Sequence, residues 1–187
     1  MRPVSRALAL VVLAFCISLC LSFCIACTGD RTGLNPQDKA PDIKGRDLNG
    51  TETSLRQVPG QVLLVNFWAT WCAPCMAELP ALQSLHTALK DRGFTVVGVA
   101  VDDSPENIRE AQAKFGITYP IIIDADSQSK RLYEIKGLPE SYVLGPEQRV
   151  QIVMDPDGRS GPVTRIVGPR EWSEKWASQV LASAATK

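Results

Sequence analysis

Two nearly continuous apolar runs of strand length stand out in the pattern of hydrophobic and polar positions. Gln61 to Ala69 reads QVLLVNFWA, and Phe94 to Asp102 reads FTVVGVAVD. Runs of this length without alternation are typical of strands that are covered on both faces. We therefore predict two buried central strands, and a third short strand at 118–124, where the chain reads TYPIIID.

Helical spacing of apolar residues follows each of the first two strands. A helix ending near Lys90 is predicted from apolar positions three and four apart, which are Leu79, Leu82, Leu85 and Leu89. A second helix is predicted to begin after Ser104 as N-cap, with Pro105 at its first position, and to end at Gly116. From Glu171 onward, Trp172, Trp176 and Val180 lie four apart and predict a last helix.

The remaining segments read as a hairpin, a short helix or turn, and further strands. Asn49-Gly50 is the expected turn of a hairpin within 41–55, and 127–137 is the expected short helix or turn. Strands are expected at 141–145, 149–155 and 163–168, the last two separated by the long loop Asp155–Pro162. This order of elements predicts an α/β fold, with a central mixed sheet flanked by helices.

The N-terminal segment predicts attachment to a membrane. Arg2 and Arg6 precede an uncharged apolar run from Ala7 to Ala26, which as a helix would match the roughly 30 Å hydrocarbon core of a bilayer. The arginines should stay cytoplasmic, which places the rest of the chain outside. We expect residues 1–27 to be a signal anchor or a lipoprotein signal, residues 28–39 a linker, and residues 40–187 the folded domain.

The two forms of attachment differ at one cysteine. The sequence CIAC, from Cys24 to Cys27, resembles a bacterial lipobox in which Cys27 would take the lipid. An uncleaved hydrophobic helix is the other possibility, and the sequence slightly favours it because Cys24 stands where such a box usually has leucine.

The charge balance and the number of cysteines limit the functions that the chain can have. Lysine plus arginine and aspartate plus glutamate are 20 each, and no basic run is interleaved with aromatics, which argues against nucleic-acid binding. Of the 6 cysteines, four lie in or beside the apolar segment, namely Cys16, Cys20, Cys24 and Cys27. The soluble part keeps Cys72 and Cys75, and a bridge between them closes too short a loop to stabilise the fold much.

The spacing of this pair favours redox chemistry over metal binding. A closed zinc site needs four ligands, and the soluble part adds only His86, which we expect to be a half-exposed helix residue. No metal and no cofactor are expected. Cys72 should begin a helix, where the dipole and free N–H groups lower the pKa of a thiol. Cys75, one turn further in, should be more buried. This predicts that Cys72 attacks a substrate disulfide and that Cys75 resolves the mixed disulfide.

The sequence VNFWATWCAPC, followed by ELP, resembles the membrane-tethered thioredoxin-like thiol–disulfide oxidoreductases of the TlpA/ResA/CcmG type. The similarity covers about Ala40 to Gly168, and it implies a thioredoxin-like fold. It also implies that Pro139 is a cis-proline opposite the cysteine pair. The backbone at Leu138 would then pair with an incoming peptide. Trp71 is expected to shield the disulfide and meet the substrate.

Glu78 is the third expected catalytic residue. Thioredoxins carry a buried aspartate where this chain has Asn66, which cannot take a proton. Glu78 lies three residues after Cys75 on the same predicted helix face, and the resemblance assigns it to the active site. We expect it to accept the proton of Cys75 and to raise the pKa values of the dithiol by charge repulsion.

The resemblance implies an extracytoplasmic reductant of disulfide-bearing proteins, with apocytochrome c as a candidate substrate. A membrane electron donor of the CcdA/DsbD type would supply the electrons. Two alternatives stay open: a peroxiredoxin-type peroxidase, which shares the fold, and a copper-binding Sco-like assembly factor. The sequence fits each less well, because the peroxiredoxin cysteine motif and a distant histidine ligand are missing.

Overall fold

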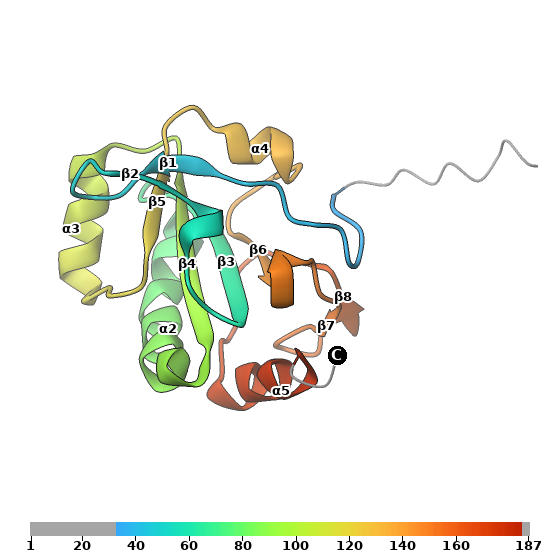
Figure 1. Cartoon of the computed structure of the whole chain (residues 1–187). Helices are drawn as coiled ribbons and strands as arrows, with labels where there is room; N and C mark the ends of the chain where they lie inside the picture. The colour runs from blue at the N-terminus through green and yellow to red at the C-terminus, as the bar shows by residue number, and fades with distance from the viewer. Residues whose placement is uncertain (1–32, 185–187) are drawn as a thin grey trace, which may run out of the picture. The chain divides into compact units, whose positions relative to one another are not determined.

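The computed structural model describes residues 33–184, and these form an α/β domain around one large sheet (Figure 1). The strands are β1 (Lys44–Arg46), β2 (Glu52–Ser54), β3 (Val62–Trp68), β4 (Phe94–Val101), β5 (Ile121–Asp124), β6 (Glu140–Leu144), β7 (Val153–Met154), β8 (Pro162–Val163) and β9 (Arg165–Val167). The helices are α2 (Ala73–Leu89), α3 (Pro105–Phe115), α4 (Gln128–Leu132) and α5 (Glu174–Ala184). Short 3-10 turns are η1 (Leu55–Gln57), η2 (Lys90–Arg92) and η3 (Pro146–Gln148).

The sheet has 7 strands among the described residues, in the order β2-β1-β5-β4-β3-β6-β9. β3, β4 and β5 run parallel, while β6 is antiparallel to β3 and β9 is antiparallel to β6. The parallel centre follows from the strand–helix–strand order of the sequence. The register sets Asn66 of β3 beside Gly98 of β4 and Ser141 of β6, which fixes what lies under the first turns of α2.

Helices and loops bury the two faces of the sheet differently. α2, α3 and α5 contribute to one apolar cluster, which includes Trp68, Leu79, Ile108 and Trp176. The other face is covered by residues 34–43, by residues 55–58 after the hairpin and by the residues after α4, with the Tyr133 ring 5.0 Å from the Phe67 ring. The strands β3 and β4 are therefore buried throughout, as their unbroken apolar runs predict.

Two local predictions are confirmed by the backbone and its hydrogen bonds. Ser104 caps α3 by accepting from the Asn107 N–H, Pro105 begins the helix, and Gly116 ends it with a φ of 62°. β1 and β2 form the predicted antiparallel hairpin around Gly50, which has a φ of 81°. Both motifs depend on neighbouring residues alone, which is why the sequence shows them.

The structure corrects two predictions and refines a third. The strand expected at 149–155 is reduced to β7, which pairs with β8 in a separate small sheet rather than joining the large one. His86 is buried at 6% exposure instead of half-exposed, because its ring packs edge-on against Tyr119. Residues 33–39 of the expected linker bond to the domain, as in the 2.8 Å bond from Gln37 N–H to Val150 O.

The predicted anchor, with Cys16, Cys20, Cys24 and Cys27, lies outside the described residues. Among residues 33–184, no helix is long and apolar enough to cross a membrane. The predicted boundaries of the segments 1–27, 28–39 and 40–187 stay predictions.

Candidate active site

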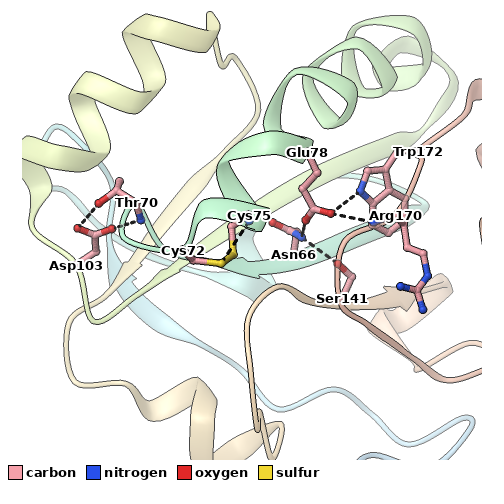
Figure 2. Close-up of a disulfide and its surroundings, with 9 residues drawn as sticks. All are labelled: Asn66, Thr70, Cys72, Cys75, Glu78, Asp103, Ser141, Arg170 and Trp172. Atoms are coloured by element: carbon pink, nitrogen blue, oxygen red, sulfur yellow. Dashed lines mark hydrogen bonds between the residues drawn. A yellow bond between two sulfur atoms is a disulfide. The ribbon is translucent and has the colours of Figure 1, made fainter.

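A disulfide joins Cys72 and Cys75 at the N-terminus of α2 (Figure 2). Cys72 is the N-cap residue of this helix, and its Sγ accepts the Cys75 backbone N–H at 3.3 Å. Cys72 is 6% exposed and Cys75 is fully buried. The sulfur with some access to solvent is thus the one that sits among the free N–H groups of the helix end, where negative charge is stabilised.

The loop that leads into α2 is fixed to the loop between β4 and α3. Thr70 donates to Asp103 through its backbone N–H at 2.5 Å and through its hydroxyl at 3.0 Å. The indole of Trp71 donates to the carbonyl of Asp102 at 3.1 Å, yet 61% of this residue is exposed. Trp71 therefore presents a large apolar surface to solvent immediately beside the cysteine pair.

The Leu138–Pro139 peptide bond is cis, as predicted. The backbone before this peptide bond is held by the buried Glu140 carboxylate, which accepts the N–H groups of Lys136 and Gly137, both at 3.1 Å. The carbonyl of Pro139 accepts the Gly168 N–H at 2.8 Å. The structure thus fixes the backbone around this proline from both sides.

Glu78 is buried at 4% exposure and is surrounded by donors. Its Oε1 accepts from Asn66 Nδ2 at 2.7 Å, and the same amide nitrogen lies 3.0 Å from the hydroxyl of Ser141. Its Oε2 accepts from the Trp172 indole at 3.2 Å and from the Arg170 N–H at 3.3 Å. In Figure 2, Asn66 lies between the disulfide and this carboxylate. Glu78 is therefore not a solvated surface residue near a helix end.

Burial, which disfavours the charged form, raises the pKa of Glu78 above its ordinary value. The hydrogen bonds from Asn66, Trp172 and the Arg170 backbone, together with the Arg170 charge, lower it and offset part of that effect. A carboxyl with a raised pKa beside a dithiol is suited to exchanging protons with it.

Two parts of this site could not be found from the sequence. Trp172 and Arg170 bond to Glu78 from more than 90 positions away along the chain. The sequence marks Trp172 only as part of an apolar helix stripe, which does fit its burial at 8% exposure. Nothing in the spacing of residues signals that its indole N–H meets a carboxylate.

Within residues 33–184, no group of three or more histidine, cysteine, aspartate or glutamate residues is arranged to hold a metal ion. His86 lies two turns beyond Glu78 on α2, and burial, together with the charge of Lys90, lowers its pKa.

A parallel-centred sheet, a Cys-x-x-Cys pair at the start of a helix and a cis-proline together define a thioredoxin-like dithiol–disulfide protein. Residues 36–158 match the model of the AhpC/TSA family, and the chain belongs to this family. It is a homologue of the thiol-disulfide oxidoreductase ResA of Bacillus subtilis (strain 168), with 31% identity over 59% of this chain. The match spans 62% of that relative's length.

Solved structures agree with this relationship. A thiol:disulfide interchange protein of the thioredoxin family from Chlorobium tepidum TLS aligns with a TM-score of 0.59 and 29% identity, over 81% of this chain and 97% of that one. A secreted thiol-disulfide isomerase from Corynebacterium glutamicum aligns with a TM-score of 0.61 and 28% identity, over 79% and 86%. The predicted fold and family are therefore confirmed, and the structure shows Cys72 and Cys75 joined as a disulfide.

Proposed function

We propose that this protein reduces disulfide bonds of other proteins outside the cytoplasm, by exchange with its Cys72–Cys75 dithiol. The observation that carries the proposal is the pair itself, bonded as a disulfide at the N-terminus of α2, with only Cys72 accessible. The exposed Trp71 beside it and the fixed backbone at Leu138–Pro139 would contact the substrate chain.

The exchange proceeds in two displacements. The Cys72 thiolate attacks one sulfur of the substrate disulfide, so that the substrate S–S bond breaks and a mixed disulfide forms. The Cys75 thiol then loses its proton and attacks the sulfur of Cys72. The substrate leaves with both of its sulfurs reduced, and the two electrons have come from the dithiol, which ends as the disulfide seen in the structure.

Glu78 is the proposed acceptor of the Cys75 proton. It is buried, lies one helical turn beyond Cys75, and has a raised pKa because of its burial. Its negative charge also disfavours a second negative charge on the dithiol, which would raise the pKa values of the thiols. Asn66, in the place of the thioredoxin aspartate, donates to Glu78 and so orients the acceptor.

The proposed location and partners follow from the N-terminal segment and from the relatives. Residues 1–27 would tether the domain to the outer side of a bacterial membrane, whether as an uncleaved anchor or through a lipid on Cys27. One similar protein is described as secreted. A membrane donor of the CcdA/DsbD type would return the dithiol to its reduced state with two electrons and two protons, and apocytochrome c is the candidate substrate.

A trapping experiment in the native host tests this proposal. In a Cys75→Ser variant the mixed disulfide cannot be resolved, so the substrate should stay bonded to Cys72. We expect mass spectrometry of the trapped species to identify proteins with paired cysteines, with apocytochrome c among them. A Cys72→Ser variant is the matched control, and it should trap nothing.

The outcomes separate the parts of the proposal. Trapping of many unrelated secreted proteins would favour a general isomerase or oxidase and contradict a dedicated reductant. The absence of any species linked to Cys72 would contradict disulfide exchange as the function.

A further inference from the structure

The loop Asp155–Pro162 is folded around one buried carboxylate. Asp155 is 3% exposed, and its Oδ2 accepts the Ser160 N–H at 3.0 Å. Its backbone N–H donates to the carbonyl of Gly161 at 2.8 Å, and its carbonyl accepts the Gly158 N–H at 2.9 Å. These bonds close the loop on itself and leave the second carboxylate oxygen of Asp155 pointing out of it.

That second oxygen holds Arg170. The Nε of Arg170 lies 2.6 Å from Asp155 Oδ1, with side-chain exposures of 8% and 0%. The Nη1 of the same guanidinium donates to the carbonyls of Pro169 at 3.0 Å and Gly168 at 3.3 Å. Burial works against the charge of Asp155, but the hydrogen bonds from Arg170 and Ser160, with the charge of Arg170, lower its pKa. The ion pair is therefore present at neutral pH.

The loop also fixes the next residue of the same segment. The Glu171 N–H donates to Asp157 Oδ1 at 3.0 Å. Arg170 and Glu171 are thus both attached to the loop, immediately before Trp172. These two bonds restrain this segment of irregular backbone.

The restrained segment is the one that binds Glu78. The Arg170 N–H and the Trp172 indole N–H both donate to Glu78 Oε2. In Figure 2 the Arg170 guanidinium points away from Glu78, so its side chain and its backbone serve different partners. A cleft of about 400 Å³ is lined by Glu78, by Arg159 of the loop and by Pro169 to Trp172.

We propose that Asp155 is a positioning residue for Glu78: through its ion pair with Arg170 it keeps the Arg170 N–H and the Trp172 indole aimed at the Glu78 carboxylate. The inference rests on the proposed role of Glu78 as proton acceptor. It gives the loop Asp155–Pro162 a part in the reaction, since the loop sets the pH range in which the acceptor works.

The direction in which the Glu78 pKa shifts distinguishes a positioning role of Asp155 from a direct effect of its charge. Loss of the ion pair would release two donors from the carboxylate, which raises the pKa of Glu78. Removal of the Asp155 charge alone would, through space, ease ionisation of Glu78 and lower its pKa. The two explanations of an Asp155→Asn variant therefore predict shifts of opposite sign.

The other groups around Glu78 are unchanged by this substitution. Asn66 faces it from β3, and Cys75 precedes it on α2. The charge of Glu78 helps to raise the pKa of Tyr119, which lies before β5. Arg170 is the charged group of the C-terminal segment that acts on it. A rise in the Glu78 pKa in Asp155→Asn must therefore come through Arg170 and the segment that it holds.

The test uses the full chain and two readouts. The first is the titration of the Glu78 carboxyl carbon by NMR, and the second is the pH profile of the reaction of the reduced protein with oxidised glutathione. We expect Asp155→Asn to raise both the Glu78 pKa and the acidic limb of the profile by about one pH unit. Asp47→Asn is the matched control, because Asp47 accepts two backbone N–H groups in the remote β1–β2 turn.

Arg170 supplies a second variant. Arg170→Lys keeps the charge but not the geometry of the pair, so it should also raise the pKa of Glu78. This variant tests the proposal even if Asp155→Asn does not fold. Asp155→Asn combined with Arg170→Lys should shift it no further than the larger single change, because both break one interaction.

Different results would contradict the positioning role of Asp155 and the proton-acceptor role of Glu78. If Glu78 titrates at the wild-type pH or lower in folded Asp155→Asn, the positioning role is wrong. If Glu78→Gln leaves the pH profile of the reaction unchanged, the proposed proton acceptor is wrong, whatever the NMR titration of the Asp155 variants shows.

Discussion

At the scale of single residues, Glu78 is subject to two opposing influences. Its burial disfavours the carboxylate, while Asn66, Trp172 and Arg170 provide hydrogen bonds that favour it. Burial is the larger effect, so the folded protein holds the Glu78 proton more tightly than the unfolded chain does. This imbalance is what the proposed role of Glu78 as a proton acceptor requires, and it also links the stability of the domain to pH.

The link to stability has a definite sign. Because folding raises the pKa of Glu78, the native state binds more protons than the unfolded state above pH 4.5, the ordinary value. The free energy of unfolding should therefore fall as the pH rises from there through the raised pKa. Each pH unit of the shift corresponds to about 1.4 kcal/mol of lost stability.

We predict that a Glu78→Gln variant of the oxidised protein lacks this fall. The difference in unfolding free energy between wild type and Glu78→Gln, measured by denaturant at a series of pH values, should decrease with rising pH and then level off. Glu110→Gln, on the exposed side of α3, is the control and should give no such trend. Parallel curves for wild type and Glu78→Gln would show that Glu78 is not perturbed by its burial.

At the scale of elements, the site depends on how closely α2 and the loops around it pack against β3 and β4. Gly98 lies in β4 beside Asn66, and a Cβ at this position would be 2.8 Å from Trp68 Nε1 and 3.2 Å from Tyr119 Cε2. Both aromatic residues are buried in the cluster shared with α2. The glycine thus lets the rings of Trp68 and Tyr119 pack closely against the backbone of β4 next to the active site.

Gly98→Ala should therefore lower the free energy of unfolding by about 1–3 kcal/mol, as expected for overpacking of a filled core. Denaturant unfolding of the oxidised protein would measure the change. Gly137→Ala is the matched control, because a Cβ there meets no atom within 4 Å. Equal stability of Gly98→Ala and Gly137→Ala would contradict this description of the packing.

Elements governed by neighbouring residues could be predicted, and those governed by distant ones could not. Ser104, Pro105 and Gly116 define α3 by their order alone, and the apolar runs define β3 and β4. The extended segment 149–155 has strand-like residues, but it does not form one strand of the large sheet: Val150 bridges to Leu144 of β6, while Val153 and Met154 pair with β8. Register and partner choice depend on contacts across the fold, and residue spacing does not contain them.

At the scale of the whole domain, the active site draws on widely separated parts of the chain. Cys72 caps α2, which also carries Cys75 and Glu78. Asn66 comes from β3, Pro139 from the loop before β6, and Trp172 from the segment before α5. The cysteine pair and Glu78 could be recognised because they lie within the first two turns of one helix. Trp172, Arg170 and Asp155 join them only after the chain has folded.

Contacts of this kind also explain why the long loop had no evident role in the sequence. Its acidic residues, glycines and Arg159 are typical of a solvated turn. Only the folded domain places Asp155 against Arg170, and through it against the site.

The central claim is that Cys72 attacks the substrate disulfide and Cys75 resolves the mixed disulfide. Peptide mapping tests this claim most directly. Reduced full-chain Cys75→Ser and Cys72→Ser variants would be mixed with a disulfide-bonded peptide, and the adducts located by mass spectrometry. We predict a stable adduct on Cys72 in Cys75→Ser, and at most a trace on Cys75 in Cys72→Ser, because Cys75 is fully buried. An adduct that accumulates faster on Cys75 than on Cys72 would contradict the account.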